Sequence, residues 1–167
     1  MSAFTLNGAS VVAADPEMPL LHALRGEFGL NGVRHGCGEE ACGACHVLVD
    51  GRSLPSCTLP VSAVAGREVT TLEGLGTRAA PHPLQTALLE EQAGQCAFCL
   101  PGIIVTASAL LKERPGMSED EWREALAGHL CRCYAHNRII RAIMKVSLGA
   151  TDSALRATSA LRSSEAG

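Results

Sequence analysis

Eight cysteines in two sets of four constrain this chain more than any other feature. The first twenty residues lack a basic segment followed by a long apolar run, so we expect no signal peptide and a reducing, cytoplasmic location. Export to the periplasm bound to a partner that carries a signal is the alternative. Cysteines in a reducing compartment indicate metal or redox chemistry rather than disulfides. The first set is Cys37, Cys42, Cys45 and Cys57, and the second is Cys96, Cys99, Cys131 and Cys133.

The first set has the spacing C-x4-C-x2-C, followed after eleven residues by Cys57. This is the plant-type spacing for a [2Fe–2S] cluster. Glycines at positions 36, 38 and 43 would let backbone N–H groups approach an anionic cluster. Structural zinc is the alternative, but zinc sites usually pair two short knuckles, whereas Cys57 stands alone. The spacing therefore favours iron and sulfide.

A predicted hairpin supports the fourth ligand of this set. The pair Asp50-Gly51 is a strong signal for a two-residue turn between "HVLV" and "RSLPSC". Counting back from that turn places Cys45 opposite Ser56. Cys57 is therefore expected beside Cys45, close to the loop that holds the other three cysteines.

The second set combines C-x2-C with C-x-C, 31 residues apart. Pro101 fits the first turn of a helix that begins next to Cys99. Cys131 and Cys133 on one continuous helix would point about 200° apart, so the helix before them must end near Leu130. Four thiolates on two loops between helices can hold one metal centre. The spacing alone leaves zinc and iron equally open.

The apolar pattern changes from period two to helical period near residue 80. Only 3% of residues are aromatic, so an aliphatic core is expected. We expect an α+β first domain at 1–75, a linker at 76–83, a helical domain at 84–149 and an exposed polar tail at 150–167. The pattern predicts strands at 3–8, 10–15, 46–49, 52–57 and 67–72, and helices at 18–29, 83–94, 101–116, 119–130 and 137–149. Ser118 and Glu121 form an expected capping box for one of these helices.

Charge and hydropathy exclude two classes of partner. The net charge is −3 without a long run of one sign, so no nucleic acid is expected. The longest apolar run, "IIVTASALL", is about half the length of a membrane-spanning helix.

Five motifs occur in a specific order: "GCGEEACGACHVLVDG", "VTTLEGL", "HPLQ", "GQCAFCLPG" and "LCRC". With them, residues 4–148 resemble the small iron–sulfur subunit of xanthine-oxidase-type molybdenum hydroxylases. The resemblance implies a plant-type ferredoxin-like (β-grasp) domain followed by a four-helix bundle. It also implies two [2Fe–2S] clusters, one on each cysteine set.

The same resemblance implies an electron-transfer subunit of an oxidoreductase complex whose substrate chemistry lies on another chain, so no catalytic residue is expected here. In the family, the cluster of the helical domain lies nearest a molybdopterin cofactor held by a large subunit. Gln95 and Cys133 would contact that cofactor. The ferredoxin-like cluster would face the electron acceptor, which would be an FAD-binding or cytochrome c subunit. A free-standing two-cluster ferredoxin and a zinc-stabilised interaction module are the alternatives.

Three departures from the family pattern leave all eight cysteines in place. The family often has glycine where this chain has Ala97, and threonine where it has Leu100. It often has T-G-Y where this chain has Tyr134, Ala135 and His136. We expect the loss of the glycine at Ala135 to alter the local backbone.

Overall fold

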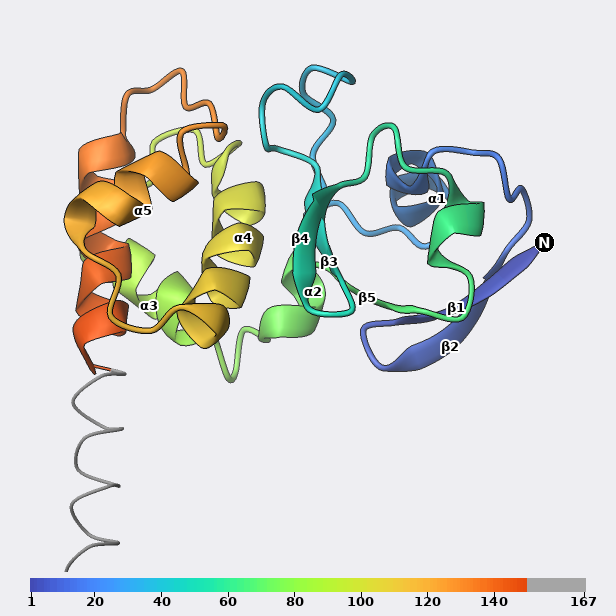
Figure 1. Cartoon of the computed structure of the whole chain (residues 1–167), viewed down its shortest axis with the longest axis horizontal. Helices are drawn as coiled ribbons and strands as arrows, with labels where there is room; N and C mark the ends of the chain where they lie inside the picture. The colour runs from blue at the N-terminus through green and yellow to red at the C-terminus, as the bar shows by residue number, and fades with distance from the viewer. Residues whose placement is uncertain (150–167) are drawn as a thin grey trace, which may run out of the picture.

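The computed structural model describes residues 1–149, in which a five-stranded sheet precedes a group of helices (Figure 1). The predicted tail at 150–167 lies outside the described residues. The sheet order is β2-β1-β5-β3-β4, and all neighbours are antiparallel except β1 and β5. The strands are β1 (Ser2–Leu6), β2 (Ala9–Ala13), β3 (His46–Val49), β4 (Arg52–Pro55) and β5 (Glu68–Thr70).

Two tight turns set the register of the sheet. Asn7 and Gly8 connect β1 to β2 with φ of 50° and 83°, and Asp50 and Gly51 connect β3 to β4 with φ of 49° and 81°. Positive φ at both central positions matches the twist of the flanking strands. The sequence predicted both turns, and the pairing of Val49 with Arg52 confirms the predicted hairpin register.

Helix α1 (Leu20–Gly26) supplies the core beneath this sheet. Leu20, Leu21 and Leu24 are fully buried and pack with Phe4 and the inner side chains of β3. The helix is shorter than the predicted 18–29, because Pro19 precedes its first residue and the backbone has left the helix by Gly29, where φ is +67°. The sequence did not predict η1 (Val61–Val64) or α2 (Leu72–Leu75).

Helical segments dominate the rest of the described chain. They are α3 (Pro83–Glu90), α4 (Leu100–Glu113), α5 (Glu119–Ala125) and a helix that includes residues 136–149. The predicted capping box of Ser118 and Glu121 starts α5. This helix ends five residues earlier than the predicted 130, since Gly128 disfavours helix and the following segment crosses to the first cysteine loop. Likewise, α3 ends at Glu90 instead of reaching 94.

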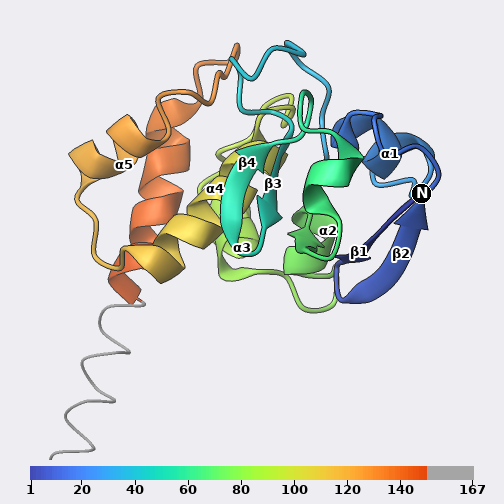
Figure 2. The ribbon, with the colours of Figure 1, turned by 45° about the vertical axis from the view of Figure 1, so that its right-hand side comes forward.

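Helix α4 joins the two halves of the molecule, which we call the N-terminal half (β1 to α2) and the C-terminal half (α3 onward). All residues from 101 to 109 are buried. Val105 and Ala109 pack against Leu48 of β3, while Ile103 belongs to a second core around Trp122. Figures 1 and 2 show α4 beside the β3–β4 hairpin, with α5 on the other side of α4. The two halves therefore share one central helix.

The start of α4 lies against the loop that carries Cys42. A Cβ atom placed on Gly102 would overlap the carbonyl oxygen of Gly43. A Cβ on Gly43 would in turn overlap the ring of His129, and the φ of Gly43 is +73°. This close approach requires glycine at both positions.

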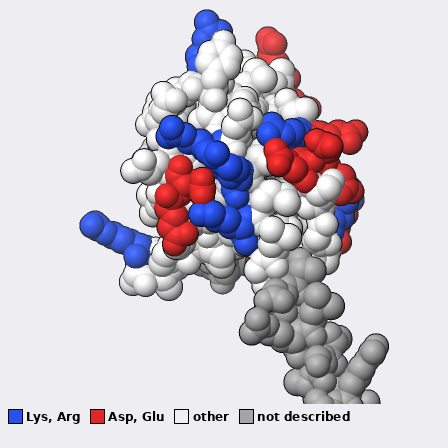
Figure 3. All heavy atoms as spheres, turned by 90° about the vertical axis from the view of Figure 1, so that its left-hand side faces the viewer, with Lys and Arg blue, Asp and Glu red and all other residues white. Residues whose placement is uncertain are grey.

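The outer face of the C-terminal half carries charges of both signs side by side (Figure 3). Arg123 lies 2.6 Å from Glu119, and Lys145 lies 2.5 Å from Glu91. Within residues 1–149, no helix combines the length and the hydropathy needed to cross a bilayer.

Replacing Gly102 with alanine should destabilise the protein by about 1–3 kcal/mol, because the added methyl group meets backbone rather than a flexible side chain. Equilibrium unfolding in urea measures this loss. Gly26→Ala is the matched control, since a Cβ at this helical position meets nothing within 4 Å. Equal stability of the two variants would contradict the close contact.

Candidate metal centres

In the first cysteine loop, backbone N–H groups donate hydrogen bonds to cysteine sulfur atoms. The amides of Glu39 and Ala41 donate to the Sγ of Cys37 at 3.3 and 3.2 Å, and the amide of Cys37 donates to the Sγ of Cys42 at 3.3 Å. The Glu39 amide is the main cause of the lowered pKa of Cys37. Amide donors that favour a thiolate also suit an anionic cluster.

The other two thiols of the first set meet behind this loop. Ser56 donates from its amide (3.3 Å) and its hydroxyl (2.7 Å) to the carbonyl of Cys45, which confirms the predicted pairing of these residues. Cys57 therefore lies beside Cys45, and both are buried. Burial, and then the hydrogen bond with Cys57, raise the pKa of Cys45 to about 11. This thiol loses its proton at neutral pH only if a metal displaces it.

The second set repeats this arrangement in the C-terminal half. The Sγ atoms of Cys133 and Cys96 lie 3.4 Å apart, and the Phe98 amide is the main cause of the lowered pKa of Cys96. Cys99 and Cys131 form the buried pair. Burial, and then the hydrogen bond with Cys131, raise the pKa of Cys99 to about 12.

Each set thus consists of one more exposed pair and one buried pair of thiols. Among the described residues, no three His, Cys, Asp or Glu side chains gather closely enough to surround a single ion. A [2Fe–2S] cluster takes four thiolates, two on each iron. Two pairs of thiols in each set therefore fit a two-iron cluster.

Loop conformation and one side-chain amide shape the second set. Cys99 precedes α4, and Pro101 lies in the first turn, as the sequence predicted. Cys131 and Cys133 lie outside helices, also as predicted. The side-chain amide of Gln95 donates to the carbonyl of Cys133 at 3.1 Å and so connects the two loops.

The expected effect of Ala135 on the local backbone stays a prediction, and the structure gives the conformation of the residues concerned. Ala135 has no positive φ; it is buried, and its carbonyl accepts the amides of Arg138 and Ile139 at the start of the last described helix. The left-handed residues are Ala97, with φ of 59°, and Tyr134, with φ of 56°. Two of the departures, Ala97 and Tyr134, therefore have the left-handed backbone that favours glycine.

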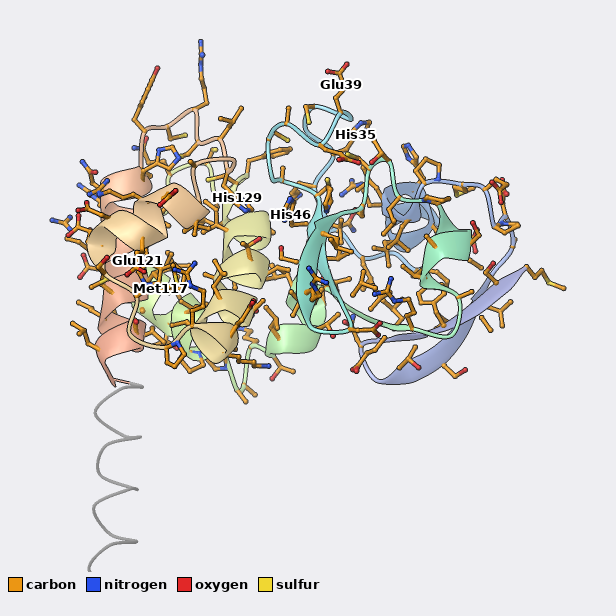
Figure 4. The ribbon with its side chains drawn as sticks, in the orientation of Figure 1. His35, Glu39, His46, Met117, Glu121 and His129 are labelled. Atoms are coloured by element: carbon orange, nitrogen blue, oxygen red, sulfur yellow. The ribbon has the colours of Figure 1, made fainter. Side chains whose placement is uncertain are left out.

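The loops that carry the two cysteine sets are hydrogen-bonded to each other. The amide of Leu130, next to Cys131, donates to the carbonyl of Cys42 at 3.1 Å. The rings of His46 and His129 pack edge to face, 4.8 Å apart, between the two halves (Figure 4). Burial lowers the pKa of His129 to about 4, so this ring is neutral at physiological pH.

The sequence did not reveal these contacts. The Nδ1 of His46 lies 2.8 Å from the Oγ of Ser53, and the Thr106 hydroxyl of α4 lies within 3.2 Å of the same nitrogen. Cys42 and Leu130 are 88 residues apart. No spacing rule links segments so distant, and only the docking of α4 brings them together.

Comparison with known proteins agrees with this geometry. A 2Fe-2S iron-sulfur cluster binding domain matches residues 4–71, and a [2Fe-2S] binding domain matches residues 71–144. One of the nicotinate dehydrogenase subunits of Pseudomonas putida is 48% identical over 143 residues, covering 85% of this chain and 91% of that protein. The small FeS subunit of nicotinate dehydrogenase from Eubacterium barkeri is 39% identical, covering 83% and 88%.

The chain belongs to the [2Fe–2S] subunits of xanthine-oxidase-type molybdenum hydroxylases.

Solved structures show the same fold in this family. Quinoline 2-oxidoreductase from Pseudomonas putida 86 superimposes with a TM-score of 0.83 at 37% identity, covering 87% of this chain and 91% of that one. Aldehyde oxidoreductase from Desulfovibrio gigas superimposes with a TM-score of 0.86 at 34% identity, covering 91% of this chain and 17% of that one. This iron–sulfur subunit thus corresponds to a whole chain in some relatives and to part of a longer chain in others.

Restoring glycine at position 97 should stabilise the protein. The left-handed conformation costs an alanine about 1–2 kcal/mol, and the greater freedom of glycine in the unfolded chain offsets about 0.5–1 kcal/mol of that gain. We expect Ala97→Gly to raise the unfolding free energy by about 0.5–1 kcal/mol. Thermal unfolding of the cluster-loaded protein measures it. Ala80→Gly, in an exposed loop without positive φ, should show no gain.

Proposed function

We propose that this chain is the electron-transfer subunit of a molybdenum hydroxylase complex, which passes electrons from a molybdopterin centre on a large subunit to a flavin or cytochrome acceptor. The main support for the proposal is that the chain carries two complete sets of four thiols on loops that are hydrogen-bonded to each other. When bound, each [2Fe–2S] cluster takes up and releases one electron at a time. The proposed ligands are Cys37, Cys42, Cys45 and Cys57 for one cluster and Cys96, Cys99, Cys131 and Cys133 for the other.

The layout of the chain supports two domains around these sites. We propose a ferredoxin-like β-grasp domain at 1–75, a linker at 76–83 and a four-helix domain at 84–149. Each proposed domain has its own hydrophobic core, one under the sheet and one around Trp122. The buried helix α4 holds the domains in one orientation, which keeps the distance between the two sites constant.

The surface beside the second set supports docking of the large subunit there. Phe98, Leu130 and Tyr134 are 44%, 61% and 82% exposed, and they line a hollow of about 760 Å³ beside Cys96 and Cys131. Exposed apolar side chains around a hollow mark an interaction surface. They also make a free-standing two-cluster carrier the weaker alternative. Gln95, whose side-chain amide donates to the carbonyl of Cys133, and Cys133 itself are the proposed contacts to the pterin.

The tip of the first cysteine loop is the proposed exit for electrons. Cys37 is exposed, and Glu39 points away from the molecule at this tip (Figure 4). The acceptor proposed here is an FAD-binding or cytochrome c subunit. Relatives named for nicotinate, isoquinoline and quinoline place nitrogen heteroaromatic compounds first among the substrates to try with the assembled complex.

Spectroscopy on the anaerobically purified chain tests the proposal. Stepwise reduction with dithionite should produce two distinct S = ½ EPR signals and about four irons per chain, as two two-iron clusters require. One signal with about two irons would mean that only one cysteine set binds a cluster. The chain would then be a ferredoxin with an accessory domain. A colourless protein that contains zinc would overturn the proposal.

Single cysteine variants should remove the signals one at a time. Cys57→Ala takes a ligand from the first set, and Cys99→Ala takes the equivalent buried thiol from the second. Each variant should lose one EPR signal and about half of the iron, because a two-iron cluster needs all four thiolates. The two variants serve as controls for each other. Loss of the same signal in both would contradict the assignment of ligands.

A charge at the apolar rim should weaken binding of the large subunit. Leu130→Lys keeps the backbone hydrogen bond to Cys42 but places an ammonium group in the rim. We expect at least a tenfold weaker affinity, equal to about 1.4 kcal/mol, with both EPR signals retained. Val12→Lys, on the edge strand β2 and 55% exposed, is the control and should leave the affinity unchanged. Calorimetric titration with the large subunit measures both.

A further inference from the structure

We propose that Arg34 is a positioning residue whose guanidinium group holds a permanent positive charge between the two cysteine sets and raises the reduction potentials of the clusters there. This inference rests on the proposed function, because it requires clusters on both sets. Arg34 lies three residues before Cys37. Its guanidinium carbon lies 5.9 Å from the centre of the Phe98 ring, and Phe98 lies between Cys96 and Cys99.

The main chain of Arg34 is anchored to the first cysteine loop. Its amide donates to the carbonyl of Ala44 at 3.2 Å, directly before Cys45. The carbonyl of the preceding residue, Val33, accepts from the guanidinium of Arg25 in α1 at 2.8 Å, and Val33 is buried. The start of the Arg34 side chain therefore has a defined position beside the first cysteine loop.

The side chain of Arg34 lacks an anionic partner within residues 1–149. Its Nε atom is buried without a hydrogen-bond acceptor, and none of the ion pairs in this part of the chain includes it. The face of an aromatic ring attracts a cation within about 6 Å, but it replaces only part of the lost hydration. Anionic clusters held by the two cysteine sets would supply counter-charge to this guanidinium. The contact with Phe98 is thus a device that keeps the guanidinium between the two sites.

A positive charge in this position affects both clusters in the same direction. Reduction adds one negative charge to a cluster, and nearby positive charge stabilises the reduced form. Charge, hydrogen bonds to sulfur and solvent exposure are the means by which a protein sets such potentials. Arg34 would supply positive charge to both sites at once and so raise both potentials.

An EPR-monitored redox titration of the full chain with both clusters tests the proposal. Arg34→Gln should lower the midpoint potential of both signals, with about a tenfold change in the equilibrium constant for reduction, equal to about 59 mV for one electron. Arg34→Lys keeps a charge without the planar group, so its shift should be smaller than half of that. Arg78→Gln changes the net charge equally but lies in the linker between α2 and α3, which is at the opposite end from the cysteine loops (Figure 1), and should shift neither signal.

A double-mutant cycle tests the role of the ring. Phe98→Leu removes the aromatic face while it keeps an apolar side chain. The shift caused by Arg34→Gln should be at least halved in the Phe98→Leu background, because the guanidinium is then no longer held between the sites. Equal shifts in both backgrounds would overturn the positioning role of Phe98.

The outcomes separate a failure of this inference from a failure of the proposed function. Two EPR signals whose potentials do not move in Arg34→Gln, or move as much in Arg78→Gln, would overturn the role of Arg34 alone. Unchanged potentials together with a lower unfolding temperature would show that Arg34 only contributes packing. Absence of a second signal in the unaltered chain would instead contradict the two-cluster function.

Discussion

The arrangement of the whole molecule depends on the contact between the two cysteine loops. The hydrogen bond from the Leu130 amide to the Cys42 carbonyl joins a residue next to one thiol set to a residue within the other. It forms only because α4 approaches the first loop without side chains in between, at Gly102 and Gly43. The buried ring of His129 then covers the same glycine. A methyl group added at either glycine would overlap atoms on the opposite side of this junction.

Burial divides the thiols of each set into two chemical kinds. Backbone amides lower the pKa of the exposed Cys37 and Cys96, whereas burial raises the pKa of Cys45 and Cys99 far above neutrality. Without metal, the buried thiols keep their protons. Metal binding must therefore release protons, and it stabilises the loops that lack regular secondary structure. Assembly of the clusters and completion of the fold are thus coupled.

The departures from the family pattern also have a structural explanation. Ala97 occupies a left-handed conformation that glycine would adopt without strain, and it lies next to Cys96, one of the proposed ligands. The hydrogen bonds of the Phe98 amide and the Gln95 side chain hold the loop in this conformation. Ala135, by contrast, fits into the start of a helix and needs no special backbone.

The sequence by itself determined the local features of this protein. Cysteine spacing indicated the first cluster site, and the Asn7-Gly8 and Asp50-Gly51 pairs predicted both turns. The helical period of the apolar residues and the capping residues located most of the helices. These signals are local, because turn geometry and helix propensity act over a few residues. Packing over long sequence distances determined where α5 stops, that the loops of the two cysteine sets meet, and that Arg34 reaches Phe98. Those outcomes depend on the packing of α4 between segments up to 88 residues apart, and no periodicity in the sequence records such contacts.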